Sequence, residues 1–534
     1  MNETPWQRLD PRMLLVYPVT EIVKYIPVLL GSVIVGTTSG NPLWSLIPVL
    51  LVAAFGVLRW FTTTYRIDAD HVQLRTGVVG RRTLSVPRPR IRSVDVEANL
   101  LHRVLGLAVL TIGTGTDTAK DEEFKLDALD TSRIPTLRTE LLSHTGRSAE
   151  RPADDAAPVH ESGVEIGHWR PAWVRYAPLS LTGLAIVAPI AGLAAQYGVL
   201  EWIVKSAPAQ EIGHDSVAVV ALVIAAMVVL TLLLVSLAAC GQYLATWYGL
   251  RVLDNGSTLH LRHGLFTTRQ ITLDLARFRG ATLNDPLLLR AARAAQLEMI
   301  MTGENPRQKV LPQAPRAAVE RTLDELLRTH RRPALTKPDY AVPQGISGTM
   351  LGTVDLISHG RAAHRRRYVR AAWPVGISLV AMIVLALVEG PLPVWIWIVP
   401  VVFAGLMAAL AEDRYRSLGH RVLPADTGPT WLITRSGSLD RNRDCLEAPG
   451  IIGWTIRQTF WQRRAGLATV VAATAAGKKA YSVVDIPYDD AVALIDAVTP
   501  GLQGVRRPLC SGREPEDFRP QSTAEHSRRG SGRK

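Results

Sequence analysis

The apolar residues of this chain are gathered into six long blocks, and the blocks occur in three pairs. Residues 25–57, for example, contain no Asp, Glu, Lys or Arg, and the turn-forming run 39–42 divides them into two blocks. A bilayer core of about 30 Å needs roughly 20 apolar residues in a helix. The alternative, six buried core helices, does not explain the pairing. We therefore predict six transmembrane helices in three hairpins, at about 20–38, 43–60, 176–200, 216–245, 371–388 and 391–411.

Arginines predict the orientation of these helices. They flank the long polar segments, as at Arg59, Arg170, Arg251 and Arg414, whereas the short connections within the pairs carry only Lys205. Loops rich in Lys and Arg stay in the cytoplasm. We therefore expect both termini and the three soluble segments to be cytoplasmic. The N-terminal residues, MNETPWQRLDPR, lack the apolar core of a removable signal peptide.

Each pair of blocks is followed by a similar soluble segment, which reveals a threefold internal repeat. The segments that begin at Gly77, Gly264 and Gly437 align without a gap. Further aligned positions are Arg103, Arg290 and Arg463, and Leu110, Leu297 and Val470. The repeating unit is thus a helical hairpin followed by one domain.

Within each soluble segment the pattern is that of short β-strands followed by a helix. In the first copy, apolar residues alternate at Val72 and Leu74, at Leu84 and Val86, and again in 91–96, while 109–112 forms a further apolar run. Helical spacing follows in all three copies, at 135–142, 317–327 and 489–498. Several strands closed off by one helix predict an α+β domain of roughly 80 residues.

The first copy resembles a known family. Its tract begins Tyr65-Arg-Ile, continues through an arginine-rich strand ending in RIRSV, and then reads LLHRVLGLAVLTI. This tract is similar to the bacterial membrane-associated pleckstrin-homology (PH) domain, and the whole chain resembles multi-pass bacterial proteins that carry three such domains. The resemblance implies a bent β-sandwich or barrel with a C-terminal helix. It implies little about function, because fold does not fix function.

The fold class that we predict is a membrane protein with six transmembrane helices in three hairpins, each followed by a cytoplasmic PH-like domain. The hairpins are placed at 1–60, 170–247 and 370–412, and the PH-like domains at 61–143, 248–330 and 413–501. Residues 144–169 and 331–369 have the polar composition of disordered linkers. Residues 502–534 are predicted to be a disordered basic tail.

No set of residues predicts catalysis, and we expect neither enzyme activity, a cofactor nor a metal. The three cysteines have no metal-ligand spacing. His260 and His263 lie in a predicted strand, where positions three apart face opposite sides. Gly113-Thr-Gly115 lacks the third glycine of a dinucleotide loop. The interiors of the spans carry no ionisable side chains, which argues against a transporter.

Clustered arginines are the main candidate for a binding site. Arg88, Arg90 and Arg92 would share one face of a strand, with Arg81 and Arg82 on the hairpin before it. The second copy keeps Arg269, Arg277 and Arg279 at equivalent positions, whereas the third copy does not. These eight residues could contact anionic lipid or a protein partner. The alternative is an ordinary solvated face.

The net charge of +13 suits an anionic membrane surface. Our leading hypothesis is a non-enzymatic scaffold or sensor at the inner face of a bacterial plasma membrane. Its expected partners are membrane lipids and either other proteins or further copies of the chain, but no nucleic acid. The alternative function is that of a transporter or an accessory protein for export or envelope stress.

Overall fold

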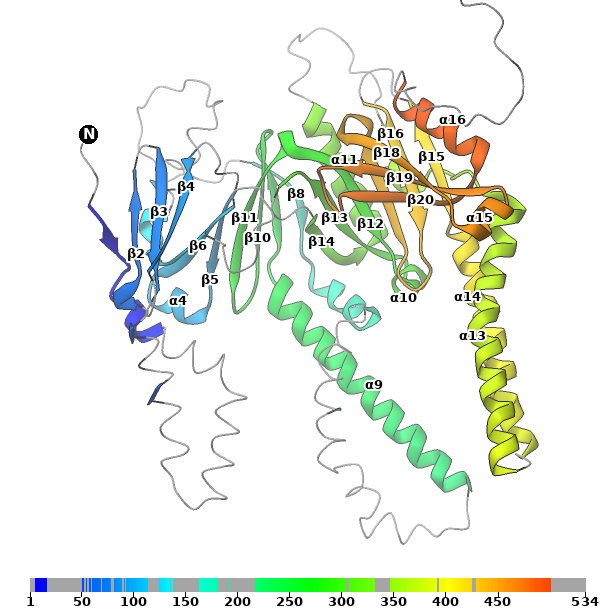
Figure 1. The fold of residues 1–534 in the computed structure, drawn as a ribbon. Coiled ribbons are helices and arrows are strands. Elements are labelled where there is room, and N and C mark those ends of the chain that lie inside the picture. Colours follow the sequence, from blue (N-terminus) through cyan, green and yellow to red (C-terminus); the bar gives the residue numbers. More distant parts are fainter. Residues whose placement is uncertain are drawn as a thin grey trace, which may run out of the picture.

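The structure, a computed structural model, describes mainly residues 5–16, 50–113, 124–137, 163–180, 217–303, 307–331, 346–390, 393–424 and 429–500, with short gaps inside these ranges. Within them, antiparallel sheets lie side by side in a row, and long helices leave the row on one side (Figure 1). The alternating strands that the sequence predicts are present, as are the helices predicted at 317–327 and 489–498.

The first domain contains two sheets. The strands β1 (Gln7–Arg8), β2 (Thr64–Ile67), β3 (His71–Thr76) and β4 (Arg82–Pro87) pair in that order. The second sheet contains β5 (Ser93–Ala98), β6 (Leu107–Gly113) and β7 (Phe124–Asp130), and the short helix α4 (Leu100–Val104) connects β5 to β6. The helix predicted at 135–142 lies largely outside the described residues.

The second domain repeats this order. Its first sheet contains β8 (Val164–His168), β9 (Arg251–Asp254), β10 (Thr258–His263) and β11 (Thr268–Asp274). Its second sheet contains β12 (Phe278–Asn284), β13 (Ala294–Met301) and β14 (Arg307–Pro315), with α10 (Leu287–Ala291) after β12. The helix α11 (Arg316–Arg331) closes the domain.

The third domain has the same plan. Its strands are β15 (Gly419–Leu423), β16 (Trp431–Ser436) and β17 (Asn442–Glu447), then β18 (Ile451–Arg457), β19 (Leu467–Thr474) and β20 (Ala480–Pro487). The helix α15 (Phe460–Arg464) follows β18, and α16 (Tyr488–Val498) ends the domain. Three aligned glycines, Gly77, Gly264 and Gly437, all have positive φ, so the glycine at this turn of the repeat has a backbone reason.

Neighbouring domains share sheets. At the first junction, β5 of the first domain pairs with β11 of the second, which makes one sheet in the order β7-β6-β5-β11-β10-β9-β8. At the second junction, β12 pairs with β17, which gives the order β14-β13-β12-β17-β16-β15. The domains are therefore joined by main-chain hydrogen bonds between strands.

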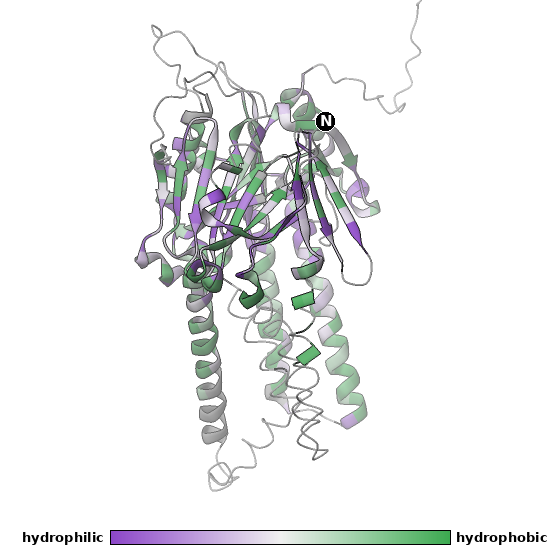
Figure 2. Cartoon of the chain, turned by 90° about the vertical axis from the view of Figure 1, so that its left-hand side faces the viewer, coloured by the Kyte–Doolittle hydropathy of each residue, from purple (hydrophilic) through white to green (hydrophobic). Residues whose placement is uncertain are grey.

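The long helices carry apolar, outward-facing side chains. They are α9 (Val217–Trp247), α13 (Gly360–Glu389) and α14 (Ile398–Arg416). Two stretches, Val229–Trp247 and Gly360–Glu389, are long and apolar enough to cross a membrane, and very little of either is buried inside the protein. Figure 2 shows the coloured parts of these helices as mostly hydrophobic, below β domains that mix hydrophobic and hydrophilic residues. The first predicted span, and most of the second and the third, lie outside the described residues.

The structure differs from our prediction for the linkers. Residues 144–169 were predicted to be disordered, but Val164–His168 forms β8, which pairs with β9. The same holds for 331–369, which includes α12 (Gly348–Thr353) and the beginning of α13. The physical reason is burial of scattered apolar side chains, since Ile166, Ile346 and Leu351 are all buried in the core of the second domain. These elements have only short apolar patterns inside polar segments, so the sequence did not predict them.

The start of the third predicted span also differs. Residues 171–179 form a 3-10 helix, η5 (Pro171–Leu179), in place of the first turn of a long helix. Its side chains Trp173 and Tyr176 are buried in the core of the second domain. The chain entering this hairpin is thus anchored to the β domain through η5 and β8.

Candidate functional site

The arginines predicted for the first domain do not form one strand face. Arg81 and Arg82 are exposed. Arg88 follows the end of β4, is buried, and donates from Nη1 to the main-chain oxygen of Asp68 at 3.4 Å. Arg90 and Arg92 lie outside the described residues. The prediction of a strand face fails at Arg88, because β4 ends at Pro87 before the chain turns into β5.

The three equivalent arginines of the second domain have different interaction partners. Arg269 forms an ion pair with Glu97 across the first junction. Arg277 lies 3.4 Å (Nε) from Asp274 Oδ2 on its own strand end. Arg279 donates to main-chain oxygens of Ala276 and Phe278 and packs against Gly450 of the third domain. Two of the three therefore contact a neighbouring domain.

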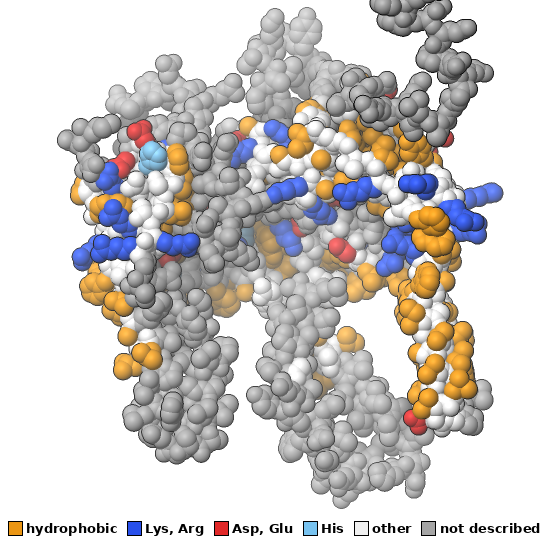
Figure 3. Space-filling model, viewed as in Figure 1, with side chains coloured by type: hydrophobic (Ala, Val, Ile, Leu, Met, Phe, Trp, Pro, Cys, Tyr) orange, Lys and Arg blue, Asp and Glu red, His pale blue; other side chains and the backbone are white. Residues whose placement is uncertain are grey.

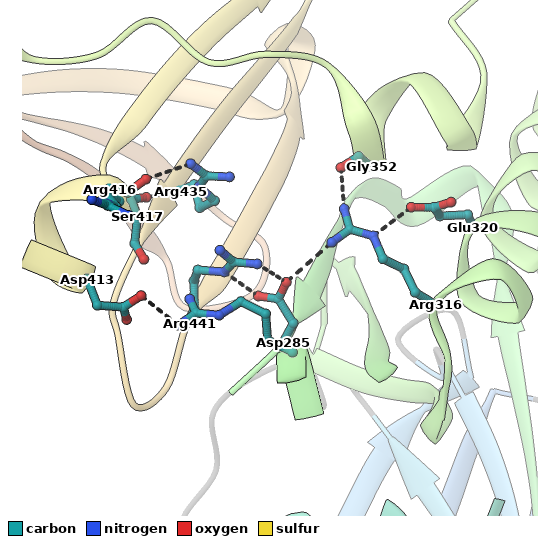
Figure 4. Close-up of polar contacts among 10 residues, drawn as sticks. Asp285, Arg316, Glu320, Gly352, Asp413, Arg416, Ser417, Arg435 and Arg441 are labelled. Atoms are coloured by element: carbon teal, nitrogen blue, oxygen red, sulfur yellow. Dashed lines mark hydrogen bonds and ion pairs between the residues drawn. The ribbon is translucent and has the colours of Figure 1, made fainter. Parts of the chain in front are cut away.

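A charged network lies at the second junction (Figure 4). Asp285 forms an ion pair with Arg441, whose Nε lies 2.7 Å from Asp285 Oδ1, and its other oxygen lies 3.6 Å from Arg316 Nη1. Arg316 also contacts Glu320 at 2.8 Å and the main-chain oxygen of Gly352 at 2.7 Å. Close by, burial chiefly lowers the pKa of Arg435 to about 10, with help from Arg441. This network joins the second domain to the third.

A cavity of about 370 Å³ opens where α13 and α14 meet the third domain. Three arginines line it, Arg367 and Arg370 from α13 and Arg414 from α14. The remaining lining residues are Leu418, Ser436, Gly437 and Val484. We call this the arginine cavity.

A buried carboxylate positions one wall of the arginine cavity. Asp485 is fully buried and lies 2.9 Å from Arg367 (Oδ2–Nη2) and 3.4 Å from Arg366 (Oδ1–Nε). Gln462 donates to the same carboxylate at 2.7 Å. Two arginines thus share one acidic group, and this wall keeps a net positive charge.

The mouth of the arginine cavity is also positive. Arg370 and Arg414 are exposed, and within the described part of the chain neither forms an ion pair. Figure 3 shows Lys and Arg side chains gathered on the third domain just above the apolar surface of the long helices. Guanidinium groups bind phosphate and carboxylate oxygens through paired N–H donors. The arrangement can therefore hold an anion at the level where helices leave the β domain.

The sequence pointed only indirectly to this cavity. A basic run at 364–370 precedes the fifth predicted span, but the candidate binding residues included none of the cavity arginines. Arg414 comes more than forty residues later and approaches Arg370 only because α13 and α14 form a hairpin. Two basic groups at matching ends of a helical hairpin were the available signal.

The histidines have structural partners. His263 is buried, stacks on Trp247, and lies 2.7 Å from the main-chain oxygen of Thr246. His260 contacts Thr258 and Thr272. Among the described residues no group of three or more His, Cys, Asp and Glu could hold a metal ion.

Comparison with known families agrees with this threefold architecture. The family model described as "Bacterial PH domain" matches residues 20–145, 183–329 and 375–500, which is more than half of the chain. The chain belongs to the bacterial PH domain family. Each match covers most of one predicted hairpin and the PH-like domain after it, so the family unit and the internal repeat coincide. Neither the curated proteins nor the solved structures include a significant match.

Proposed function

We propose that this bacterial PH-domain protein is a non-enzymatic scaffold of the plasma membrane, whose three PH-like domains lie on the cytoplasmic face and bind anionic lipid headgroups. The observation that carries the proposal is the arginine cavity. It is lined by the N-terminal third of α13, a helix long and apolar enough to span a membrane. Phosphate groups of lipids lie at this level of a bilayer, next to the helix ends.

The multi-pass topology belongs to this proposal. Six spans in three hairpins would hold each domain at the membrane surface, because every hairpin begins and ends at the same sheet. In the first domain β1 precedes the hairpin and pairs with β2 after it, and in the second β8 pairs with β9. In the third, Ile357 and His420 form the corresponding bridge. Arginine-rich flanks support a cytoplasmic location of the domains.

A scaffold role is supported by the shared sheets. Strand pairing at both junctions fixes the order and spacing of the three domains. Such a row offers a long surface of fixed shape and needs no catalytic group.

The test measures lipid retained by the full chain in nanodiscs that contain phosphatidylglycerol or phosphatidylcholine. The changed variant carries Arg370→Gln and Arg414→Gln, and the matched control carries Arg361→Gln and Arg365→Gln, which alter exposed arginines on the same helix outside the cavity. Each basic group near an anionic lipid contributes about 1 kcal/mol. The cavity variant should therefore lose about thirtyfold in preference for phosphatidylglycerol.

Competition with inorganic phosphate separates a headgroup site from a site for a free anion. A lipid site keeps its phosphatidylglycerol when phosphate is added, whereas a free-anion site releases it. Equal retention by the cavity variant and its control would refute the proposal.

A further inference from the structure

Two strands at opposite ends of the row lack the neighbour that their counterparts have. At each junction the last strand of one domain's first sheet pairs with the first strand of the preceding domain's second sheet. The last strands of the first sheets are β4, β11 and β17. The first strands of the second sheets are β5, β12 and β18. In the described part of the chain, β4 pairs only with β3, and β18 pairs only with β19. The repeat thus ends in two open edges of complementary type.

Both junctions use the same register. At the first, Glu97 lies opposite Arg269, and at the second, Asn284 lies opposite Asn442. The gapless repeat aligns Glu97 with Asn284, and Arg269 with Asn442. Carried over to the open strands, this register places Arg457 of β18 opposite Arg82 of β4, and Gly453 opposite Val86.

A glycine of the second junction is repeated on the open edge. At Gly280 of β12 an added Cβ would collide with the main-chain oxygen of Cys445 on β17. Gly453 occupies the same position in β18, where nothing lies within 4 Å of an added Cβ. Both strands also have a bulge immediately before this glycine. β18 therefore has the shape of a strand that receives a neighbour.

The first junction shows what the glycine contributes. Its equivalent in β5 is Ser93, and there the paired positions extend only over Val96, Glu97 and Ala98. In β12 the pairing continues to Gly280. A glycine at this position lets the two backbones approach along the full strand.

An arginine that bridges both junctions has no partner at the open end. Arg103 donates to the main-chain oxygen of Leu265 in the second domain at 3.1 Å. The aligned Arg290 lies 2.6 Å from Asp413, at the end of α14. The third member, Arg463, is exposed, and its side chain forms no hydrogen bond or ion pair with any described residue.

From these observations we propose that copies of this chain associate head to tail, with β18 of one copy pairing with β4 of the next in the register of the second junction. The sheet of the third domain then continues into the first domain of the neighbour. Such a heterologous contact makes a ring where the rotation closes and a filament where it does not. Because every copy is attached to the membrane, the assembly lies in its plane.

Arg82 and Arg457 would tune this association. Like charges directly opposite each other destabilise a strand pair. At the first junction the same position holds the ion pair of Glu97 with Arg269. The contact between copies is thus weaker than an internal junction, and it strengthens when salt screens the two arginines.

The experiment uses the full chain in membranes. Two differently tagged copies are co-expressed, one with Arg82→Cys and the other with Arg457→Cys, after the three native cysteines have been replaced by serine or alanine. Mild oxidation should yield a covalent product that carries both tags. The matched control replaces Arg457→Cys by Arg421→Cys, an exposed residue of β15, and should give no product.

Two further variants test the strand contact itself. Gly453→Val has space within one chain and should abolish the cross-linked product while the thermal unfolding of the chain stays the same. Arg457→Glu restores the charge pair of the first junction and should tighten association about fivefold, measured as the fraction of oligomer in nanodiscs.

The proposal is overturned if the cysteine pair gives no covalent product and both variants leave the oligomer fraction unchanged. It is also overturned if the open strands cross-link only to a different membrane protein, because their neighbour is then not a second copy. None of these changes alters the arginine cavity, so lipid retention should be the same in all variants.

Discussion

The two junctions between domains are built from the same repeat but differ in extent and burial. The first pairs three positions of β5 and β11, and its ion pair is open to solvent, with Arg269 51% and Glu97 35% exposed. The second pairs five positions of β12 and β17 and contains the buried Asp285 network. The hydrophobic cores differ in the same way, because they merge across the second junction but not across the first.

Buried residues of the first domain form a cluster of their own, whereas Trp431 and Ile433 of the third domain belong to the cluster of the second. Conversely, Ile300 of the second domain belongs to the cluster of the third. Strand pairing alone therefore produces a weak connection, and pairing together with a merged core produces a tight one. We expect the first junction to open more readily than the second.

Among the changes that we predict, Gly280→Val in the second junction should lower the stability of the protein the most. The valine Cβ would collide with the main-chain oxygen of Cys445, and the φ of 152° at Gly280 disfavours any other residue. We expect a loss of about 3 kcal/mol or more in unfolding free energy, with proteolysis between the second and third domains. Gly453→Val is the matched control, and denaturant unfolding with limited proteolysis is the measurement. Equal stability of the two variants would show that β12 and β17 do not pair.

Removing one carboxylate at each junction should show that the second junction contributes more to stability than the first. Asp285→Asn leaves Arg441, whose side chain is only 12% exposed, without its carboxylate. Breaking such a pair costs about 3 kcal/mol. Glu97→Gln removes the solvent-exposed pair of the first junction and should cost less than about 1 kcal/mol. Thermal unfolding of both variants in detergent provides the measurement, and a larger effect of Glu97→Gln would reverse our order.

A buried histidine pair offers a smaller, pH-controlled change confined to the third domain. His359 Nε2 lies 3.0 Å from His420 Nδ1, and His359 contacts the main-chain oxygen of Val484 at 2.8 Å. Burial lowers both pKa values, and with the adjacent His359 it lowers the pKa of His420 from 6.5 to about 4.

Between pH 6.5 and about pH 4, the ordinary and the lowered pKa of His420, the unfolded chain therefore binds more protons than the folded chain. Stability is fully present above pH 6.5 and falls as the pH drops toward 4. At pH 5 the loss from His420 should be about 2 kcal/mol. Unfolding is compared at pH 7.5 and pH 5 in the wild type and in His420→Gln, which should lose less stability on acidification. An identical loss in both proteins would exclude the pair as the cause.

Local features of the fold could be predicted from the sequence. Gly264 and Gly437 mark turns that require positive φ, and the spacing of Leu323, Leu326 and Leu327 predicts the helix α11. These features depend on residues close together in the chain, so short patterns suffice. The threefold repeat and the family follow from the same patterns.

Features that depend on distant residues could not be predicted. The pairing of β12 with β17 joins segments about 160 residues apart, and many registers fit the same alternation. The arginine cavity requires the α13–α14 hairpin to bring Arg370 beside Arg414. Arg88 was placed on an exposed face because its spacing fitted a strand, whereas the strand ends one residue earlier.

Hydrogen exchange of the full chain in nanodiscs tests the central claim, that shared sheets join the three domains, most directly. The account predicts slow exchange of the amides of β12 and β17, faster exchange at β5 and β11, and the fastest at β14, which pairs with a strand on one side only among the described residues. The contradicting result is exchange in β12 and β17 as fast as in β14. The three domains would then be independent units joined only by the polypeptide chain.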